Sequence, residues 1–411
     1  MDREDTITTA IEAVINAGEL AGAGTLVWQN GEVLQTGAVG WRDIATGLPI
    51  ERDTLFRIAS MTKPITSMAA LMLCEAGRFA LNEPITRWAP EFSQMRVLRS
   101  PVGSLDHTDP AERPITFEDL LTHRSGLSYM SLQQGPIADA YQALGGDIGS
   151  PLTPDAWIAE LATLPLVSQP GTAFHYGHST DLLGLLIARI EEAPLGDVLE
   201  RLIFRPLGMK DTGFTIPPEK RGRQAKMYGF DEAGRLTEHT IHPDYAMMLE
   251  RPGTTTYVSG GGGLWSTLDD YLAFARMFVS EGAIDGVQLL RPETLARMVS
   301  NHLTARQRAE ARLVGMSPFV EGHGFGLGVA VVLEPEKADP IRCCGGVGTV
   351  GWPGAWGGWW QADPNNHSVL IFLAHNFVNL DQLAQGIGLG VYDAISQFHT
   401  RATTLLYQAG N

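Results

Sequence analysis

Ser60 and Lys63 are the two side chains of this sequence whose types and spacing best suit covalent chemistry. An extended apolar run ends at Ser60, and Ile65, Met68 and Leu71 then recur at helical spacing, so we expect a helix to begin near Ser60. Residues three apart lie on one helical face, which brings the amine to the hydroxyl. A serine becomes a nucleophile when a neighbouring base takes its proton. The pair therefore predicts an acylated serine with a lysine base, the alternative being a helix-capping serine beside a solvated lysine.

Length and composition indicate a globular chain with a sizeable core. Its 411 residues, 44% hydrophobic and 18% charged, suffice for two domains or for one large domain with an elaborated lobe. The net charge of −16 disfavours nucleic acid and anionic membranes as partners. The three cysteines, Cys74, Cys343 and Cys344, do not have the pattern of a disulfide framework or of a zinc site. The acidic start lacks the features of an export signal, and we predict a cytoplasmic protein without a membrane span.

Hydrophobic periodicity and turn signals place the other elements. Strand-like runs separated by short connections without helices indicate an antiparallel sheet. The expected elements are a helix over 6–18, a hairpin around Asn30 and Gly31, a helix from Ser60 to about Gly77, strands at 326–333 and 368–373, a region rich in glycine and tryptophan at 347–360, and a helix at 382–398. We also expect capping boxes from Thr116 to Asp119 and from Ser266 to Asp269.

These elements predict an α+β fold with an antiparallel sheet, helices on both of its faces, and a mostly helical insert. We assign residues 1–78 and 255–411 to the sheet domain and residues 79–254 to the helical domain, with the active site between them. The four glycines at 260–263 lack the Lys-Ser/Thr ending of a phosphate loop, so close backbone packing is the preferred explanation. His123 is interpreted as a turn or core histidine.

Three stretches in the right order resemble the serine β-lactamase and penicillin-binding-protein superfamily. Ser60-Met61-Thr62-Lys63 matches the S-x-x-K motif, Tyr176-Gly177-His178 falls where that superfamily has Tyr-x-Asn, and Trp356-Gly357-Gly358 falls where β-lactamases have Lys-Thr-Gly. Within the superfamily, the chain resembles the class C β-lactamase-like carboxylesterases called family VIII esterases. Supporting stretches at 120–127 and 204–209 extend the likeness over nearly the whole chain. The resemblance implies the β-lactamase/transpeptidase-like fold.

The resemblance also implies the roles of individual residues. Ser60 is the acylated nucleophile, and Lys63 and Tyr176 form the base system, with the proton on either group. The backbone amides of Ser60 and Trp359 form the oxyanion hole, and Trp356, Gly357, Gly358 and His178 bind substrate. Trp352, Trp359 and Trp360 are interpreted either as pocket lining or as core.

Two departures from the superfamily pattern shape the expected substrate. His178 replaces the asparagine that contacts a β-lactam amide. Trp356 replaces the lysine that engages an anionic carboxylate, and a tryptophan offers apolar area and one donor instead of a positive charge. Both changes favour neutral short-chain esters over penicillins. We expect hydrolysis through an acyl-serine intermediate, with a small-molecule ester as partner and no metal or cofactor.

Several alternatives stay open at this point. The same acyl-enzyme serves acyl transfer to an alcohol or amine, or weak β-lactamase activity. An α/β-hydrolase would use Ser179, because residues 177–181 begin like a nucleophile elbow, but Asp181 stands where the motif has glycine. A non-catalytic binding protein on a retired enzyme fold is the third alternative, and the presence of Ser60, Lys63 and Tyr176 argues against it.

Overall fold

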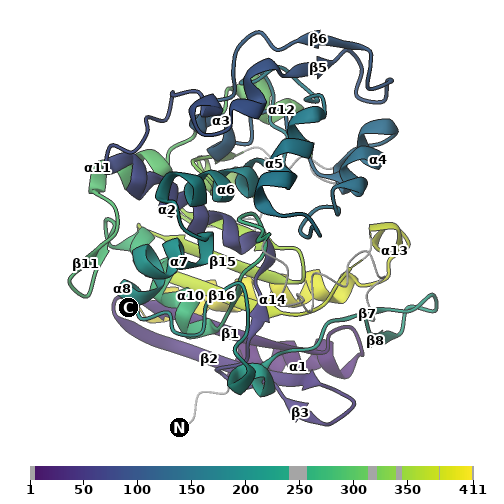
Figure 1. The fold of residues 1–411 in the computed structure, drawn as a ribbon. Helices are drawn as coiled ribbons and strands as arrows, with labels where there is room; N and C mark the ends of the chain where they lie inside the picture. Colours follow the sequence, from purple (N-terminus) through teal and green to yellow (C-terminus); the bar gives the residue numbers. More distant parts are fainter. Residues whose placement is uncertain (1–4, 240–256, 313–321, 339–344, 379, 410–411) are drawn as a thin grey trace.

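A single antiparallel sheet forms the centre of the molecule (Figure 1). The computed structural model describes residues 5–239, 257–312, 322–338, 345–378 and 380–409. The sheet has eight strands in the order β12-β13-β14-β15-β16-β1-β2-β3, so strands from the two ends of the chain pair in its middle. These strands are β1 Gly22–Gln29, β2 Glu32–Asp43, β3 Leu48–Pro49, β12 His323–Phe325, β13 Ala330–Val332, β14 Val350–Gly354, β15 Gly358–Asp363 and β16 Ser368–Ala374.

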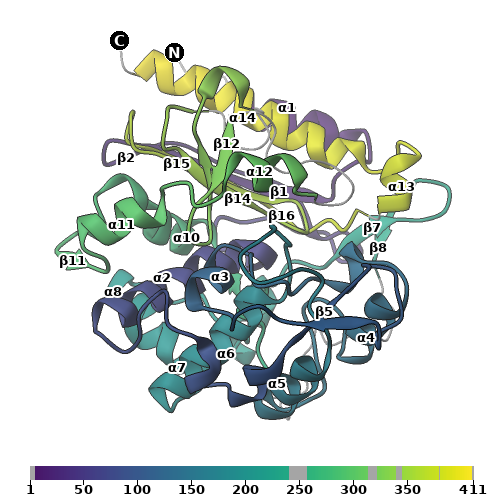
Figure 2. The same cartoon turned by 90° about the horizontal axis from the view of Figure 1, so that it is seen from above.

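Helices cover both faces of this sheet, as the sequence predicted (Figure 2). On one face lie α1 Thr6–Asn16 and α14 Leu389–Ala409, and on the other lie α2 Thr62–Glu75 and α10 Leu268–Ala275. Successive residues of a strand point to opposite faces. Ile371 therefore packs into the cluster that contains α2, whereas Phe372 packs into the cluster that contains α1 and α14. Because both faces are covered, β16 is buried along its whole length.

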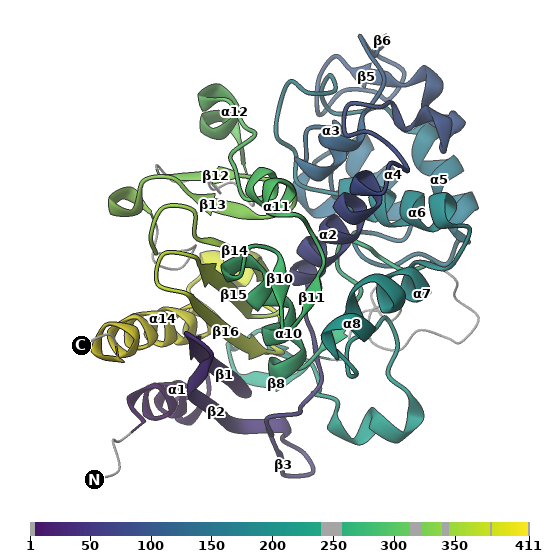
Figure 3. The same cartoon turned by 90° about the vertical axis from the view of Figure 1, so that its left-hand side faces the viewer.

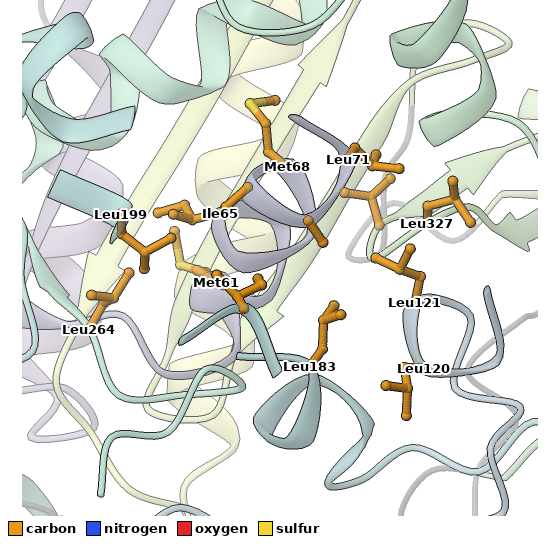
Figure 4. Close-up of a cluster of buried hydrophobic side chains, with 14 of the residues drawn as sticks. Met61, Ile65, Met68, Leu71, Leu120, Leu121, Leu183, Leu199, Leu264 and Leu327 are labelled. Carbon is orange, nitrogen blue, oxygen red and sulfur yellow. The ribbon is translucent and has the colours of Figure 1, made fainter. Parts of the chain in front are cut away.

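A group of helices lies beyond α2, in the upper part of Figure 1. They pack on α2 chiefly through α6, which is apolar over most of its circumference because it lies inside this layer. Figure 4 shows Met61, Ile65, Met68 and Leu71 packed among leucines of other elements, including Leu183 of α6. The elements of the upper part are α3 Phe117–Leu121, α4 Pro136–Ala143, α5 Pro154–Thr163 and α6 Ser179–Glu191, with the strand pair β5 Arg96–Leu98 and β6 Thr108–Pro110. Below them follow α7 Leu195–Leu199 and α8 Arg205–Leu207, and the strand pair β7 Tyr228–Phe230 and β8 Leu236–Glu238 lies beside the sheet, where Tyr228 bridges to Asn376 after β16.

Shorter elements complete the fold, and Figure 3 shows α11 and α12 beside strands β12 and β13. They are β4 Phe56–Arg57 with β9 Trp265–Ser266, β10 Ala283–Ile284 with β11 Val287–Gln288, α11 Pro292–Met298, α12 Ala305–Glu310 and α13 Leu380–Ala384. In the described part of the chain, no helix combines the length and the apolar character that crossing a bilayer requires.

One apolar cluster runs from the sheet through α2 into the helical part, so α2 belongs to the packing of both layers. The division at 78/79 stays a prediction, and the boundary at 254/255 lies outside the described residues, as do Cys343 and Cys344.

Most of the expected elements are present, including α1, the Asn30-Gly31 hairpin with both residues at positive φ, and the Thr116 capping box. Three expectations need correction. The strand expected at 326–333 is confined to β13, because Gly328 adopts a φ of 93° in the turn before it. The helix expected at 382–398 is two helices, broken where Gly386 and Gly388 adopt positive φ. The cap of α10 is Thr267 with Asp270, one residue later than expected.

Candidate active site

Ser60 lies in a single 3₁₀ turn, Ala59–Met61, that leads directly into α2. The preceding residue, Ala59, has a φ of 45°, which is a strained left-handed conformation for a residue with a Cβ. The strain is held in place because the amide of Ile58 donates to the carbonyl of Leu264, and Ala59 itself is fully buried. This turn leaves Ser60 half-buried at the start of the helix. The predicted position of the serine at the helix start is confirmed.

Lys63 is almost completely buried, and its amine makes three polar contacts. Its Nζ lies 3.2 Å from Ser60 Oγ, 3.3 Å from the hydroxyl of Tyr129 and 2.6 Å from the carbonyl oxygen of Gly261. The structure therefore brings Ser60 and Lys63 within hydrogen-bond distance, as their spacing predicted. Gly261 belongs to the glycine run, and a Cβ there would lie 2.9 Å from both Tyr129 Oη and Asp181 Oδ1. The run thus serves close packing, the explanation preferred from the sequence.

Tyr176 lies beside this pair, with its ring centroid 4.5 Å from Lys63 Nζ. Its hydroxyl accepts a hydrogen bond from the indole N–H of Trp352, at 3.0 Å. Among the described residues, no hydrogen bond joins this hydroxyl to Ser60 or Lys63. The structure brings the three predicted catalytic residues together, and it adds Trp352 of β14 as a direct partner of the phenol.

Tyr129 and Asp181 complete the site, although no role was predicted for either residue from the sequence. The hydroxyl of Tyr129 donates to Asp181 Oδ2 at 3.1 Å, and Asp181 Oδ1 accepts from the hydroxyl of Ser259 and from the amide of Gly261. Burial raises the pKa of Asp181, but the hydrogen bond and charge of His178, the charge of Lys63 and the Ser259 bond together lower it below its ordinary value. Burial and the charge of Asp181 raise the pKa of Tyr129 well above its ordinary value. At neutral pH the site therefore holds a carboxylate and a protonated phenol.

The turn between β14 and β15 packs against the segment that carries Ser60. A Cβ on Gly354 would lie 2.7 Å from the carbonyl oxygen of Ile58, and one on Gly358 would lie 2.8 Å from Met61 Sδ. Trp356, in this turn, packs with Ala59 in a small apolar cluster. The predicted stretch 356–358 thus lies next to the segment that carries Ser60, and the substrate-binding roles of Trp356, Gly357 and Gly358 stay predictions.

Trp359 follows the turn in β15, paired with Pro353 on one side and Phe372 on the other. Its side chain is buried in the cluster with α1 and α14, and that of Trp360 is buried in the cluster with α2. Both rings are core, which decides the choice between core and pocket that the sequence left open. The role of the Trp359 amide in the oxyanion hole stays a prediction.

His178 is buried, with its ring packed against Tyr129, Tyr141 and Trp157. Its Nδ1 lies 3.2 Å from Asp181 Oδ2. This environment favours a structural role for His178 over the predicted contact with substrate, which stays untested.

His123 is a core residue, as the sequence indicated, and its ring lies 4.7 Å from that of Tyr176. Burial and the charge of Lys63 lower its pKa well below the ordinary value, so His123 is neutral at pH 7. Ser179, the nucleophile of the α/β-hydrolase alternative, is fully buried and bonded to Ser125. Because every pairing in the large sheet is antiparallel, that alternative is wrong.

Comparison with known proteins agrees with this geometry. A family model described as Beta-lactamase matches residues 7–387. Protein Rv1367c of Mycobacterium tuberculosis strain H37Rv is 46% identical over 371 residues, which cover 90% of each chain. Esterase EstB of Burkholderia gladioli is 32% identical over 371 residues, covering 87% of this chain and 86% of its own. A solved structure of EstCE1, described as a hydrolase with promiscuous acyltransferase activity, has a TM-score of 0.74 at 25% identity and covers 95% of this chain and 98% of its own.

The chain belongs to the beta-lactamase family, since the family match runs over most of its length. Within that family it is a serine hydrolase of the esterase-like kind.

Proposed function

We propose that this protein is a carboxylesterase that hydrolyses short-chain neutral esters through an acyl-Ser60 intermediate. The observation that carries the proposal is the 3.2 Å contact between Lys63 Nζ and Ser60 Oγ inside a buried polar network. The similarity to Esterase EstB and to EstCE1 supports an ester as the substrate.

Lys63 is the general base in this proposal, because it is the titratable group within hydrogen-bond distance of the nucleophile. A neutral amine has two N–H groups and one lone pair. The carbonyl of Gly261 accepts one N–H, and Tyr129, whose own proton is directed to Asp181, accepts the other. The lone pair of Lys63 then faces the hydroxyl proton of Ser60. As Ser60 Oγ bonds to the ester carbonyl carbon, that proton passes to Lys63.

Tyr176 supplies the proton that the leaving group needs. The indole N–H of Trp352 can only donate, so the oxygen of Tyr176 is the acceptor in their hydrogen bond and its own proton is left to face substrate. When the tetrahedral intermediate expels the alcohol oxygen, Tyr176 protonates it. The proton taken up by Lys63 returns to the Tyr176 phenolate when the two neighbouring groups come within hydrogen-bond distance during the reaction. The ring face of Tyr176, close to the ammonium of Lys63, stabilises that cation during the step. The amides of Ser60 and Trp359 are the proposed donors to the oxyanion.

Water then repeats the sequence in reverse: it attacks the acyl carbonyl, gives its proton to the Tyr176–Lys63 pair, and Ser60 leaves with the proton returned to it. An alcohol can take the place of water, and the promiscuous acyltransferase activity ascribed to EstCE1 favours acyl transfer as a second activity. Product analysis of p-nitrophenyl butyrate turnover with added methanol measures the division between butyric acid and methyl butyrate. We expect the acid in water alone and a growing share of methyl ester as methanol is raised.

The matched pair Ser60→Ala and Ser179→Ala tests the proposal. Ser60→Ala should lower p-nitrophenyl butyrate hydrolysis about 1,000-fold or more, and intact-mass analysis should show that it no longer takes up a fluorophosphonate. Ser179→Ala removes the hydroxyl of another serine at the start of a helix, and this variant should still be labelled by the fluorophosphonate and should still hydrolyse the ester. Activity retained in Ser60→Ala, or no hydrolysis of acetate and butyrate esters by the folded wild-type protein, would overturn the proposal.

The proposed substrate is a neutral small molecule, because the surroundings of the Ser60–Lys63 pair are largely aromatic. The rings of Tyr129 and Tyr176 lie near Lys63, Trp352 packs on Tyr176, and Trp356 packs in a cluster with Ala59. We further propose a cytoplasmic location. The acidic composition of the chain supports the absence of nucleic-acid and anionic-membrane partners.

A further inference from the structure

Asp181 accepts four hydrogen bonds close to the Ser60–Lys63 pair. It is fully buried at the start of α6. Four donors converge on it: the hydroxyl of Ser259 and the amide of Gly261 on Oδ1, and the hydroxyl of Tyr129 and Nδ1 of His178 on Oδ2. Burying a carboxylate costs free energy unless its oxygens are hydrogen-bonded, and all of these bonds are present.

Two of those four donors are in turn the partners of Lys63. Gly261 donates its amide to Asp181 and offers its carbonyl to Lys63, and Tyr129 donates its hydroxyl to Asp181 and offers its oxygen to Lys63. The carboxylate of Asp181 therefore holds in place both Gly261 and Tyr129, the two groups that accept hydrogen bonds from the amine of Lys63.

We propose that Asp181 is a positioning residue that sets the direction of the Tyr129 hydrogen bond and thereby keeps the lone pair of Lys63 available to Ser60. This inference rests on the proposed esterase mechanism and deepens it. An ionised carboxylate only accepts, so Tyr129 must donate to Asp181 and accept from Lys63.

The substitution Asp181→Asn reverses this direction. The backbone amide of Gly261 can only donate, so the amide oxygen of the new side chain is held on the Gly261 side. Its NH₂ group then faces Tyr129, whose oxygen becomes the acceptor. The Tyr129 proton turns to Lys63 and occupies the lone pair that would otherwise take the proton of Ser60. Acylation slows although the fold keeps nearly the same shape.

A second substitution separates this account from a merely structural one. Tyr129→Phe removes the misdirected proton, so Tyr129→Phe combined with Asp181→Asn should be faster than Asp181→Asn alone. Loss of packing at a buried site predicts the opposite, because two substitutions in one contact network ordinarily cost at least as much as one.

The experiment measures the single-turnover acylation rate with p-nitrophenyl butyrate by stopped flow, together with the thermal unfolding midpoint of each variant. We expect Asp181→Asn to be about 1,000-fold slower than wild type, Tyr129→Phe about tenfold slower, and the double variant within about tenfold of Tyr129→Phe. Asp270→Asn is the matched control: Asp270 is also buried and accepts from Thr212 and from the amide of Asp211, and its substitution should leave acylation unchanged.

The inference would be overturned if Asp181→Asn acylated within about threefold of the wild-type rate, or if the double variant acylated as slowly as Asp181→Asn. If Asp181→Asn does not fold, Tyr129→Phe alone decides: an unchanged kcat rejects the link, and a lower kcat at constant KM supports it. Failure of the proposed function looks different, because wild type and Asp270→Asn would then both lack esterase activity or Ser60→Ala would retain it.

Discussion

The indole N–H of Trp352 donates to the hydroxyl of Tyr176 at 3.0 Å, joining strand β14 to the loop before α6. The tryptophan predicted from the sequence to bind substrate is Trp356, whereas the described tryptophan that contacts the Tyr176 hydroxyl is Trp352. The two rings also pack together, with centroids 5.4 Å apart. This hydrogen bond holds the Tyr176 hydroxyl in position and occupies one lone pair of its oxygen.

Trp352→Phe should therefore lower activity while keeping the aromatic packing. We expect kcat to fall about fivefold, because loss of one hydrogen bond of about 1 kcal/mol lets the Tyr176 hydroxyl leave its position. Steady-state kinetics on p-nitrophenyl butyrate measure the change. Trp360→Phe, a substitution in the core cluster beside α2, is the control, and it should lower the unfolding midpoint with little effect on kcat. Equal kcat values for wild type and Trp352→Phe would contradict the assigned role.

Lys63→Arg tests whether Lys63 acts as a base or only as a fixed positive charge. A guanidinium does not lose its proton at the pH of catalysis, so it cannot accept one from Ser60. Arginine in a space shaped for a buried lysine should be as inactive as Lys63→Ala, about 1,000-fold below wild type. Activity of Lys63→Arg within about tenfold of wild type would show that charge alone suffices. Circular dichroism of both variants checks that they fold.

The contact between Ser60 and Lys63 was predictable because a local rule, the three-residue spacing on a helix, relates the two residues. Tyr176 was found only through its motif, since more than a hundred residues separate it from Ser60. No comparable signal exists for Tyr129, Asp181 and Gly261. They lie in three separate segments, and only the packing of α6 against α2 and the close approach of a glycine bring them to one amine.

The fold was predictable for a similar reason. Alternation and turn residues identify a hairpin such as that at Asn30 and Gly31 from local sequence alone. The choice between Trp352 and Trp356 depends instead on the register of β14 with β15, which pairs Trp352 with Trp360 and leaves Trp356 in the turn. A stretch rich in glycine and tryptophan is compatible with more than one such register.

Gly354→Ala and Gly358→Ala form a matched pair at the turn that supports Ser60. The new Cβ of Gly354→Ala meets the carbonyl oxygen of Ile58, which is backbone, whereas that of Gly358→Ala meets Met61 Sδ, the end of a flexible side chain. We expect Gly354→Ala to destabilise the fold by about 1–3 kcal/mol and to lower kcat at least about tenfold, because the segment next to Ser60 must move. Gly358→Ala should have a smaller effect on both.

Urea unfolding and steady-state kinetics measure these effects. Gly222→Ala is the control, because a Cβ at Gly222 meets no atom within 4 Å; it should change stability by less than about 0.5 kcal/mol. A larger loss of unfolding free energy and kcat in Gly358→Ala than in Gly354→Ala would refute this account of the turn.

Burial of His375 is expected to make the folded protein less stable as the pH falls. It is buried, and Nδ1 lies 2.9 Å from the carbonyl oxygen of Ala225, to which it donates. Burial, with the charge of Arg57, lowers the pKa of His375 to about 3. In the unfolded chain its pKa is about 6.5. Between these values the unfolded state binds the extra proton, so this contribution to stability is complete above about pH 6.5 and is lost as the pH falls toward 3.

His375→Asn keeps a donor for Ala225 but does not titrate. Urea unfolding should show the variant less stable than wild type at pH 7.5, and the difference should shrink by about 2 kcal/mol at pH 5, where wild type has lost part of its advantage. His107→Asn, at an exposed histidine, should leave the difference from wild type the same at both pH values. A His375→Asn difference that is constant with pH would mean that another group causes the acid sensitivity, since the histidine would then carry the same proton count in both states.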